Sequence, residues 1–157
     1  MPHHKSLLID FAILLALVLI AATGYFYSPL LLPKSDVTAD PDPGCDLQQQ
    51  ACAATLPGGG RVELSITPRP IPTLKNLVVD VRVSGIIAKQ VAVDFTGVGM
   101  SMGYNRAPLQ ATDADHFTGS ANLPVCITGA MPWQSTVLLD TDRLHITVPF
   151  RFASQPH

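Results

Sequence analysis

An almost uncharged apolar run extends from Leu7 to Leu32, and Asp10 is its single charged residue. A helix that crosses a hydrocarbon core of about 30 Å needs roughly 20 predominantly apolar residues, which this run supplies. Asp10 lies near the amino end, where a carboxylate can reach the headgroup layer. An aromatic Tyr-Phe-Tyr cluster at residues 25–27 lies near the other end, as in an interfacial belt. The run therefore predicts a transmembrane signal-anchor helix over residues 7–32.

Lys5 is the only fixed positive charge before this run. The positive-inside rule therefore places residues 1–6 in the cytoplasm of a bacterium. The protein is expected in the inner membrane as a single-pass chain with a periplasmic carboxyl-terminal part. A cleaved signal peptide is the alternative, because residues 22–24 (Ala-Thr-Gly) resemble a small-residue cleavage site. Both readings export the rest of the chain.

The composition limits what the exported part can be. The chain has 157 residues and a formal charge of −2, and its Lys and Arg residues are scattered. A nucleic-acid surface would need a basic patch, so nucleic acid is not expected as a partner. Fourteen prolines and eleven glycines, without a long 3.6-residue apolar period, favour short strands joined by turns.

Residues 33–60 are rich in Pro, Gly and Asp and are predicted to form a flexible linker. This segment contains Cys45 and Cys52. In an oxidising compartment the pair predicts a local disulfide. A metal or redox pair is the alternative, although the spacing is neither C-x-x-C nor that of a zinc site.

The remaining residues, 61–157, are predicted to form the periplasmic domain. Seven segments within it resemble short strands, and the clearest alternate apolar and polar residues, as strands with one buried face do. They are residues 61–67, 77–84, 90–96, 107–112, 116–123, 133–139 and 143–152. This pattern predicts an all-β fold, an antiparallel β-sandwich of about seven strands. A small closed barrel is the alternative.

Three methionines lie in loops bounded by Gly or Pro instead of in the predicted core strands: Met100, Met102 and Met131. Thioether sulfur is a soft ligand that favours Cu(I). Alternate residues of an extended segment project to the same side, so the sulfurs of Met100 and Met102 could converge on one cuprous ion. The alternative is that these methionines fill the open end of the core.

Cys126 and His116 are candidate ligands beside the methionines, and Trp133 could shield the ion through cation–π attraction. Each has a structural alternative. Cys126 could be a small buried residue or pair with another chain, His116 a loop residue, and Trp133 part of the core. Catalytic motifs such as G-x-S-x-G, H-E-x-x-H and the P-loop are missing from the sequence, so an enzyme is not expected.

The amino-terminal apolar run, the Gly99–Gly103 segment and the Cys126–Trp133 segment together carry a resemblance. In this layout the chain resembles the small, single-helix-anchored periplasmic β-sandwich proteins of bacterial respiratory-oxidase and copper-handling loci. The resemblance implies an immunoglobulin-like or cupredoxin-like sandwich. It also implies Cu(I) as the bound ion and a respiratory oxidase or another inner-membrane complex as the partner.

Two functional hypotheses follow. In the first, the domain is an accessory protein that binds or delivers Cu(I) through its methionine loop. In the second, it binds no metal and is a structural subunit that docks on a larger membrane complex through the loop of residues 97–105.

Overall fold

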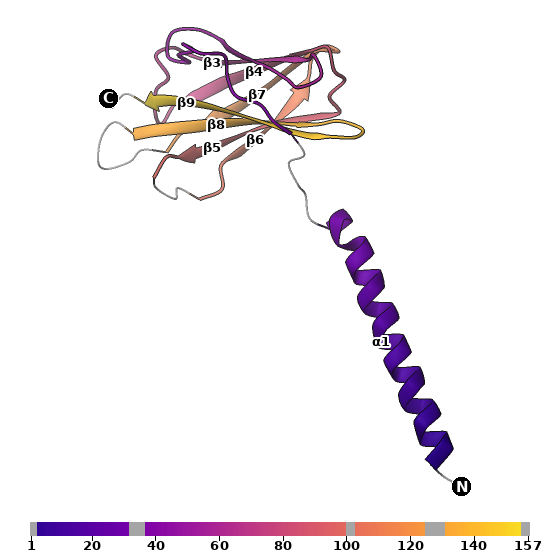
Figure 1. Cartoon of the computed structure of the whole chain (residues 1–157). Coiled ribbons are helices and arrows are strands. Elements are labelled where there is room, and N and C mark those ends of the chain that lie inside the picture. The colour runs from indigo at the N-terminus through magenta and orange to yellow at the C-terminus, as the bar shows by residue number, and fades with distance from the viewer. Residues whose placement is uncertain (1–2, 32–36, 100–102, 125–130, 155–157) are drawn as a thin grey trace. The chain divides into compact units, whose positions relative to one another are not determined.

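The computed structural model describes residues 3–31, 37–99, 103–124 and 131–154. The chain divides into two compact units, Met1–Lys34 and Ser35–His157 (Figure 1). Each unit is described by itself. Met100, Met102 and Cys126 lie outside the described residues.

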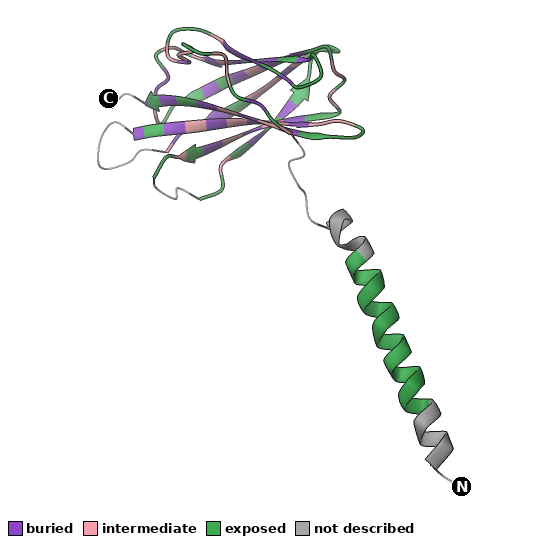
Figure 2. Ribbon diagram, in the orientation of Figure 1, coloured by how far each residue is buried: buried purple, intermediate pink, exposed green. Residues whose placement is uncertain are grey.

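The first unit is one helix, α1 (His3–Leu31), over the segment that the apolar run predicts to be helical. Leu and Ala, which lose little conformational freedom in a helix, are the most frequent residues of α1. Its described side chains, from Ile9 to Tyr25, are all exposed (Figure 2). Among the described residues, no helix meets the combined length and apolarity that crossing a membrane requires.

The second unit is built from strands, as the sequence predicts. They are β1 (Val37–Thr38), β2 (Cys52–Thr55), β3 (Arg61–Thr67), β4 (Asn76–Ser84), β5 (Gln90–Gly97), β6 (Arg106–Ala111), β7 (His116–Asn122), β8 (Met131–Asp140) and β9 (His145–Ser154). The seven predicted segments correspond to β3–β9, with ends displaced by at most two residues.

The strands form one curled sheet in the order β1-β9-β8-β5-β6-β7-β4-β3-β2. Strand β6 pairs with β5 through residues 106–109 and with β7 through residues 110–111. Because β6 changes partner along its length, the ladder continues from one half of the sheet to the other. The all-β prediction is confirmed, but the strands form a curled half-barrel and not a clear sandwich. The ladder is also mixed, because β1 is parallel to β9.

Strands β6 and β7 approach each other closely in the region where β6 changes partner. A Cβ atom added to Gly119 in β7 would lie 2.6 Å from Cδ2 of Leu109 and 2.9 Å from the carbonyl oxygen of Pro108. Only glycine lets β6 approach β7 so closely without a shift of the neighbouring atoms.

The core lies on the concave face of the sheet. The alternation of the strands predicts its residues, because successive side chains of a strand point to opposite faces. The predicted inward residues that are buried are Val62, Leu64, Ile66, Leu77, Val79, Val81, Val83, Val91, Val93, Phe95, Ile146, Val148, Phe150 and Phe152. Leu144, also predicted to face inward, is exposed because it lies in the turn before β9, where Thr141 N donates to its carbonyl oxygen.

The segment predicted to be a flexible linker, residues 33–60, contributes β1, β2 and buried side chains to the second unit. Ala39 N donates to Thr147 O at 3.1 Å, and Asp42 N donates to Ala53 O at 2.8 Å. The segment thus runs from the β9 edge to the β2 edge of the open sheet. Leu47 lies in it and is fully buried. Both local contacts, such as the Asp42–Ala53 bond, and distant ones, such as the Ala39–Thr147 bond, hold this segment, and its turn-rich composition does not indicate the distant ones.

Candidate functional site

The loop that contains Met100 and Met102 and the loop that contains Cys126 are joined at both ends. Val98, at the start of the first loop, donates its backbone N–H to Pro132 O at 2.9 Å, just beyond the second loop. Asn105, at the end of the first loop, donates through Nδ2 to Asn122 O at 2.9 Å, just before the second loop. We call this end of the second unit, defined by Val98, Asn105, Asn122 and Pro132, the sulfur end.

The prediction that Met131 lies in a loop is wrong: it is the first residue of β8 at the sulfur end, and its side chain is buried on the core face. Trp133, the next residue on that face, is also buried, as the structural alternative for this residue expects. Its indole Nε1 donates a hydrogen bond to Ser154 Oγ at 3.2 Å. The Ser154 hydroxyl donates in turn to Met131 O at 3.4 Å. This chain of contacts fixes the base of the sulfur end.

His116 lies away from this cluster. It is the first residue of β7 and pairs in register with Arg82, whereas Asn122 lies at the other end of the strand. At about 3.3 Å per residue, β7 separates His116 from the sulfur end by roughly 20 Å. Its Nε2 contacts Asp80 Oδ1 at 3.1 Å, and both side chains are half-buried. The structure therefore brings Met131 to the base of the loops but does not bring His116 there.

The last residues of the methionine loop, 103–105, include an exposed aromatic side chain that the sequence predictions do not include. Tyr104 is 78% exposed, and the Arg106 guanidinium carbon lies 5.0 Å from the centroid of its ring. Arg106 Nη2 also lies 3.3 Å from Asp94 Oδ2. An exposed cation–π contact contributes about 0.5–1 kcal/mol. The signal in the sequence is the spacing Tyr-x-Arg directly after Gly103.

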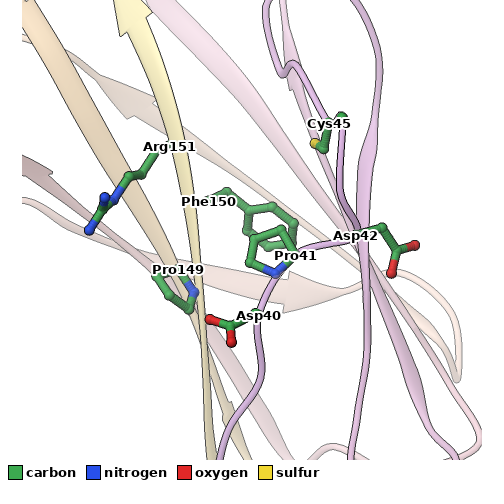
Figure 3. A pocket seen from close by; sticks show the side chains of 8 residues that line it. Asp40, Pro41, Asp42, Cys45, Pro149, Phe150 and Arg151 are labelled. Carbon is green, nitrogen blue, oxygen red and sulfur yellow. The ribbon is translucent and has the colours of Figure 1, made fainter.

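A cleft of about 400 Å³ lies between residues 40–45 and β9 (Figure 3). Its lining residues are Asp40, Pro41, Asp42, Gly44, Cys45, Pro149, Phe150 and Arg151. Figure 3 shows Phe150 and Pro41 at its centre, with Arg151 and Asp42 on opposite sides. The sequence could not reveal this cleft, because its two walls come from opposite ends of the second unit's sequence.

A disulfide between Cys45 and Cys52 holds the first wall of the cleft, with a Cα–Cα distance of 5.5 Å. The pair is the one that the sequence predicts. Gln48, inside the disulfide loop, accepts a hydrogen bond from Ile71 N at 2.6 Å through Oε1. Its Nε2 donates to Ala153 O in β9. These contacts fasten residues 37–60, which we call the cover segment, to both halves of the sheet.

The described residues contain no cluster of three or more His, Cys, Asp or Glu side chains that could hold a metal ion. A soft-metal site would therefore depend on the methionine and cysteine sulfurs of the two loops. Comparisons with protein-family models, with curated proteins and with solved structures give no match for this chain.

Proposed function

We propose that this chain is a membrane-anchored periplasmic accessory protein that binds or delivers Cu(I) through Met100 and Met102. One observation carries the proposal: two hydrogen bonds, Val98–Pro132 and Asn105–Asn122, join the methionine loop to the Cys126 loop at both ends. Three sulfur-containing residues, Met100, Met102 and Cys126, therefore belong to two loops whose ends are hydrogen-bonded to each other.

The chemistry of these residues supports Cu(I). Thioether and thiolate sulfur are soft donors, which select Cu(I) over harder cations. A thioether also carries no proton at ordinary pH, so methionine binds the ion without a protonation step. Met131 lies at the base of the same end with its side chain in the core, so the sulfur residues on the loops themselves are Met100, Met102 and Cys126.

Two features support the anchor and the export of the second unit. The first is in the sequence, where the apolar run from Leu7 to Leu32 contains one charged residue, Asp10. The Cys45–Cys52 disulfide fits an oxidising compartment such as the periplasm. The expected result is that the chain stays in the membrane fraction after a high-salt wash, whereas a variant in which a cleavable signal peptide replaces residues 1–34 is recovered as a soluble periplasmic protein. Release of the full chain by salt would contradict the anchor.

The Cu(I) proposal is tested by anaerobic titration of the detergent-solubilised full chain, in competition with a chromophoric Cu(I) chelator and with ascorbate as reductant. The double variant Met100→Leu and Met102→Leu is expected to lose at least tenfold in affinity. His116→Asn is the matched control, because His116 lies at the far end of β7, and its affinity should equal that of the unmodified chain. Unchanged affinity in the double variant would refute the proposal.

The second candidate function is a metal-free subunit that docks on a respiratory oxidase or another inner-membrane complex. The exposed Tyr104, held by Arg106 beside the methionine loop, favours it. Tyr104→Ser is then expected to reduce co-purification with a multi-subunit membrane complex, whereas the double methionine variant keeps it. A chain that co-purifies with no such complex would contradict this candidate.

A further inference from the structure

Two exposed apolar side chains protrude from neighbouring turns at the end of the second unit opposite the sulfur end. Ile87 lies in the β4–β5 connection and is 83% exposed, and Leu144 lies in the β8–β9 turn and is 40% exposed. Lys89 joins the two turns, because its backbone N–H donates to Asp140 O at 2.7 Å and its ammonium group pairs with Asp142. We call residues 85–89 and 141–145 the entry turns.

The chain enters the second unit beside these turns. Val37, the first described residue after α1, pairs in register with Ile146, two residues beyond Leu144. Only residues 32–36 connect α1 to β1, and an extended chain of that length spans roughly 20 Å. If α1 is held in a bilayer, the entry turns cannot lie far from the lipid surface.

We propose that the entry turns rest on the bilayer surface and insert the side chains of Ile87 and Leu144 at the boundary between headgroups and acyl chains. The proposal rests on the anchoring function of α1. Exposed apolar side chains bind this boundary through the apolar area that they bury there.

The charges of the entry turns indicate that apolar insertion dominates this contact. Lys89 pairs with Asp142, and His145 Nδ1 lies 2.8 Å from Asp140 Oδ1. The remaining charged residue of the turns is the exposed Arg143, and with His145 neutral the two cations Lys89 and Arg143 are balanced by Asp140 and Asp142. The turns therefore present no strongly basic surface to anionic lipids. The contact is therefore expected on zwitterionic phosphatidylcholine and is insensitive to salt.

This placement turns the sulfur end away from the membrane. Strand β8 runs from Met131 at the sulfur end to Asp140 beside the entry turns, and its ten residues span roughly 30 Å. The methionine and Cys126 loops then face the periplasm, and a metal or partner reaches them from the aqueous side.

The test uses the full chain reconstituted in phosphatidylcholine vesicles that contain lipids brominated on their acyl chains, which quench nearby tryptophan. Ile87→Trp places the probe in an entry turn. Leu74→Trp is the matched control, because Leu74 is 68% exposed and precedes β4, whereas Ile87 follows it. The native Trp133 stays in both variants as a buried common background.

The expected result is that brominated lipid removes about half of the emission of the Ile87→Trp chain, at low and high salt alike, and leaves the Leu74→Trp chain at the level of the unmodified protein. Vesicle flotation of each chain is measured in parallel. Flotation with equal emission from the two variants would overturn the inference and leave the anchor intact. Failure of every chain to float would overturn the anchor and this inference together. Quenching that disappears at high salt would also overturn it, because it would indicate electrostatic docking.

Discussion

Trp133 and Ser154 join the start of β8 to the end of β9 through a buried hydrogen bond of 3.2 Å between the indole Nε1 and the serine hydroxyl. Both side chains lie in the core, where water cannot replace a lost partner. A buried donor without an acceptor costs about 1–3 kcal/mol.

Ser154→Ala is therefore expected to lower the free energy of unfolding of the second unit by about 1–3 kcal/mol, because it leaves the Trp133 N–H unpaired. Urea unfolding of the detergent-solubilised chain, followed by the fluorescence of its single tryptophan, measures the change. Ser120→Ala, on an exposed position of β7, is the control and should have little effect. Equal midpoints for the two variants would show that the bond is not stabilising.

Loss of the Cys45–Cys52 disulfide should destabilise the same unit by about 2 kcal/mol, the entropy that a short closed loop removes from the unfolded chain. The double variant Cys45→Ser and Cys52→Ser tests this in the same urea assay. Addition of a thiol reductant should shift the midpoint of the unmodified chain to that of the double variant. If the reductant also shifts the urea midpoint of the double variant, the shift arises from a group other than this disulfide.

Gln48 ties the cover segment to the sheet, since its side chain accepts from Ile71 N and donates to Ala153 O. Gln48→Ala is expected to cost about 1–2 kcal/mol and to increase hydrogen exchange at the Ile71 amide. Gln50→Ala, two residues away and exposed, is the matched control. If both variants exchange at the same rate, the cover segment does not depend on this side chain.

Gly119→Ala is expected to destabilise the half-barrel by about 1–3 kcal/mol, because the new methyl group would overlap Leu109 and the carbonyl oxygen of Pro108. The urea midpoint measures the cost. The double variant Gly119→Ala and Leu109→Ala relieves only the contact with the leucine side chain. Its loss should therefore be less than the sum of the losses of the two single variants, and strict additivity would contradict the close approach.

The sequence could predict most of the strands because their pattern is local. In β3, β4 and β5 every second residue is apolar, and one buried face is enough to produce that period. The Cys45–Cys52 pair was predictable for a similar reason, because the two residues are close in the sequence and the apolar run implies export. Leu144 shows the limit of the pattern: its alternation continues into a turn, where the strand has not yet begun.

The arrangement of these strands was not predictable, because it depends on pairs that are distant in the sequence. No local feature of the β6 sequence indicates that the strand stops pairing with β5 after residue 109 and pairs with β7 instead. The cover segment is similar, since its Ala39–Thr147 bond joins residues more than a hundred positions apart and needs β9 in place.

By itself, the sequence determined an apolar helical segment, a β-strand domain with its inward residues, and a local disulfide, since each follows from a short-range pattern of side chains. Only the tertiary structure decided that the Met100–Met102 loop and the Cys126 loop share their stems and that His116 lies at the other end of β7. The physical reason is strand direction: antiparallel pairing sends every second connection to the same end of a sheet, and only the complete strand order shows which loops meet there.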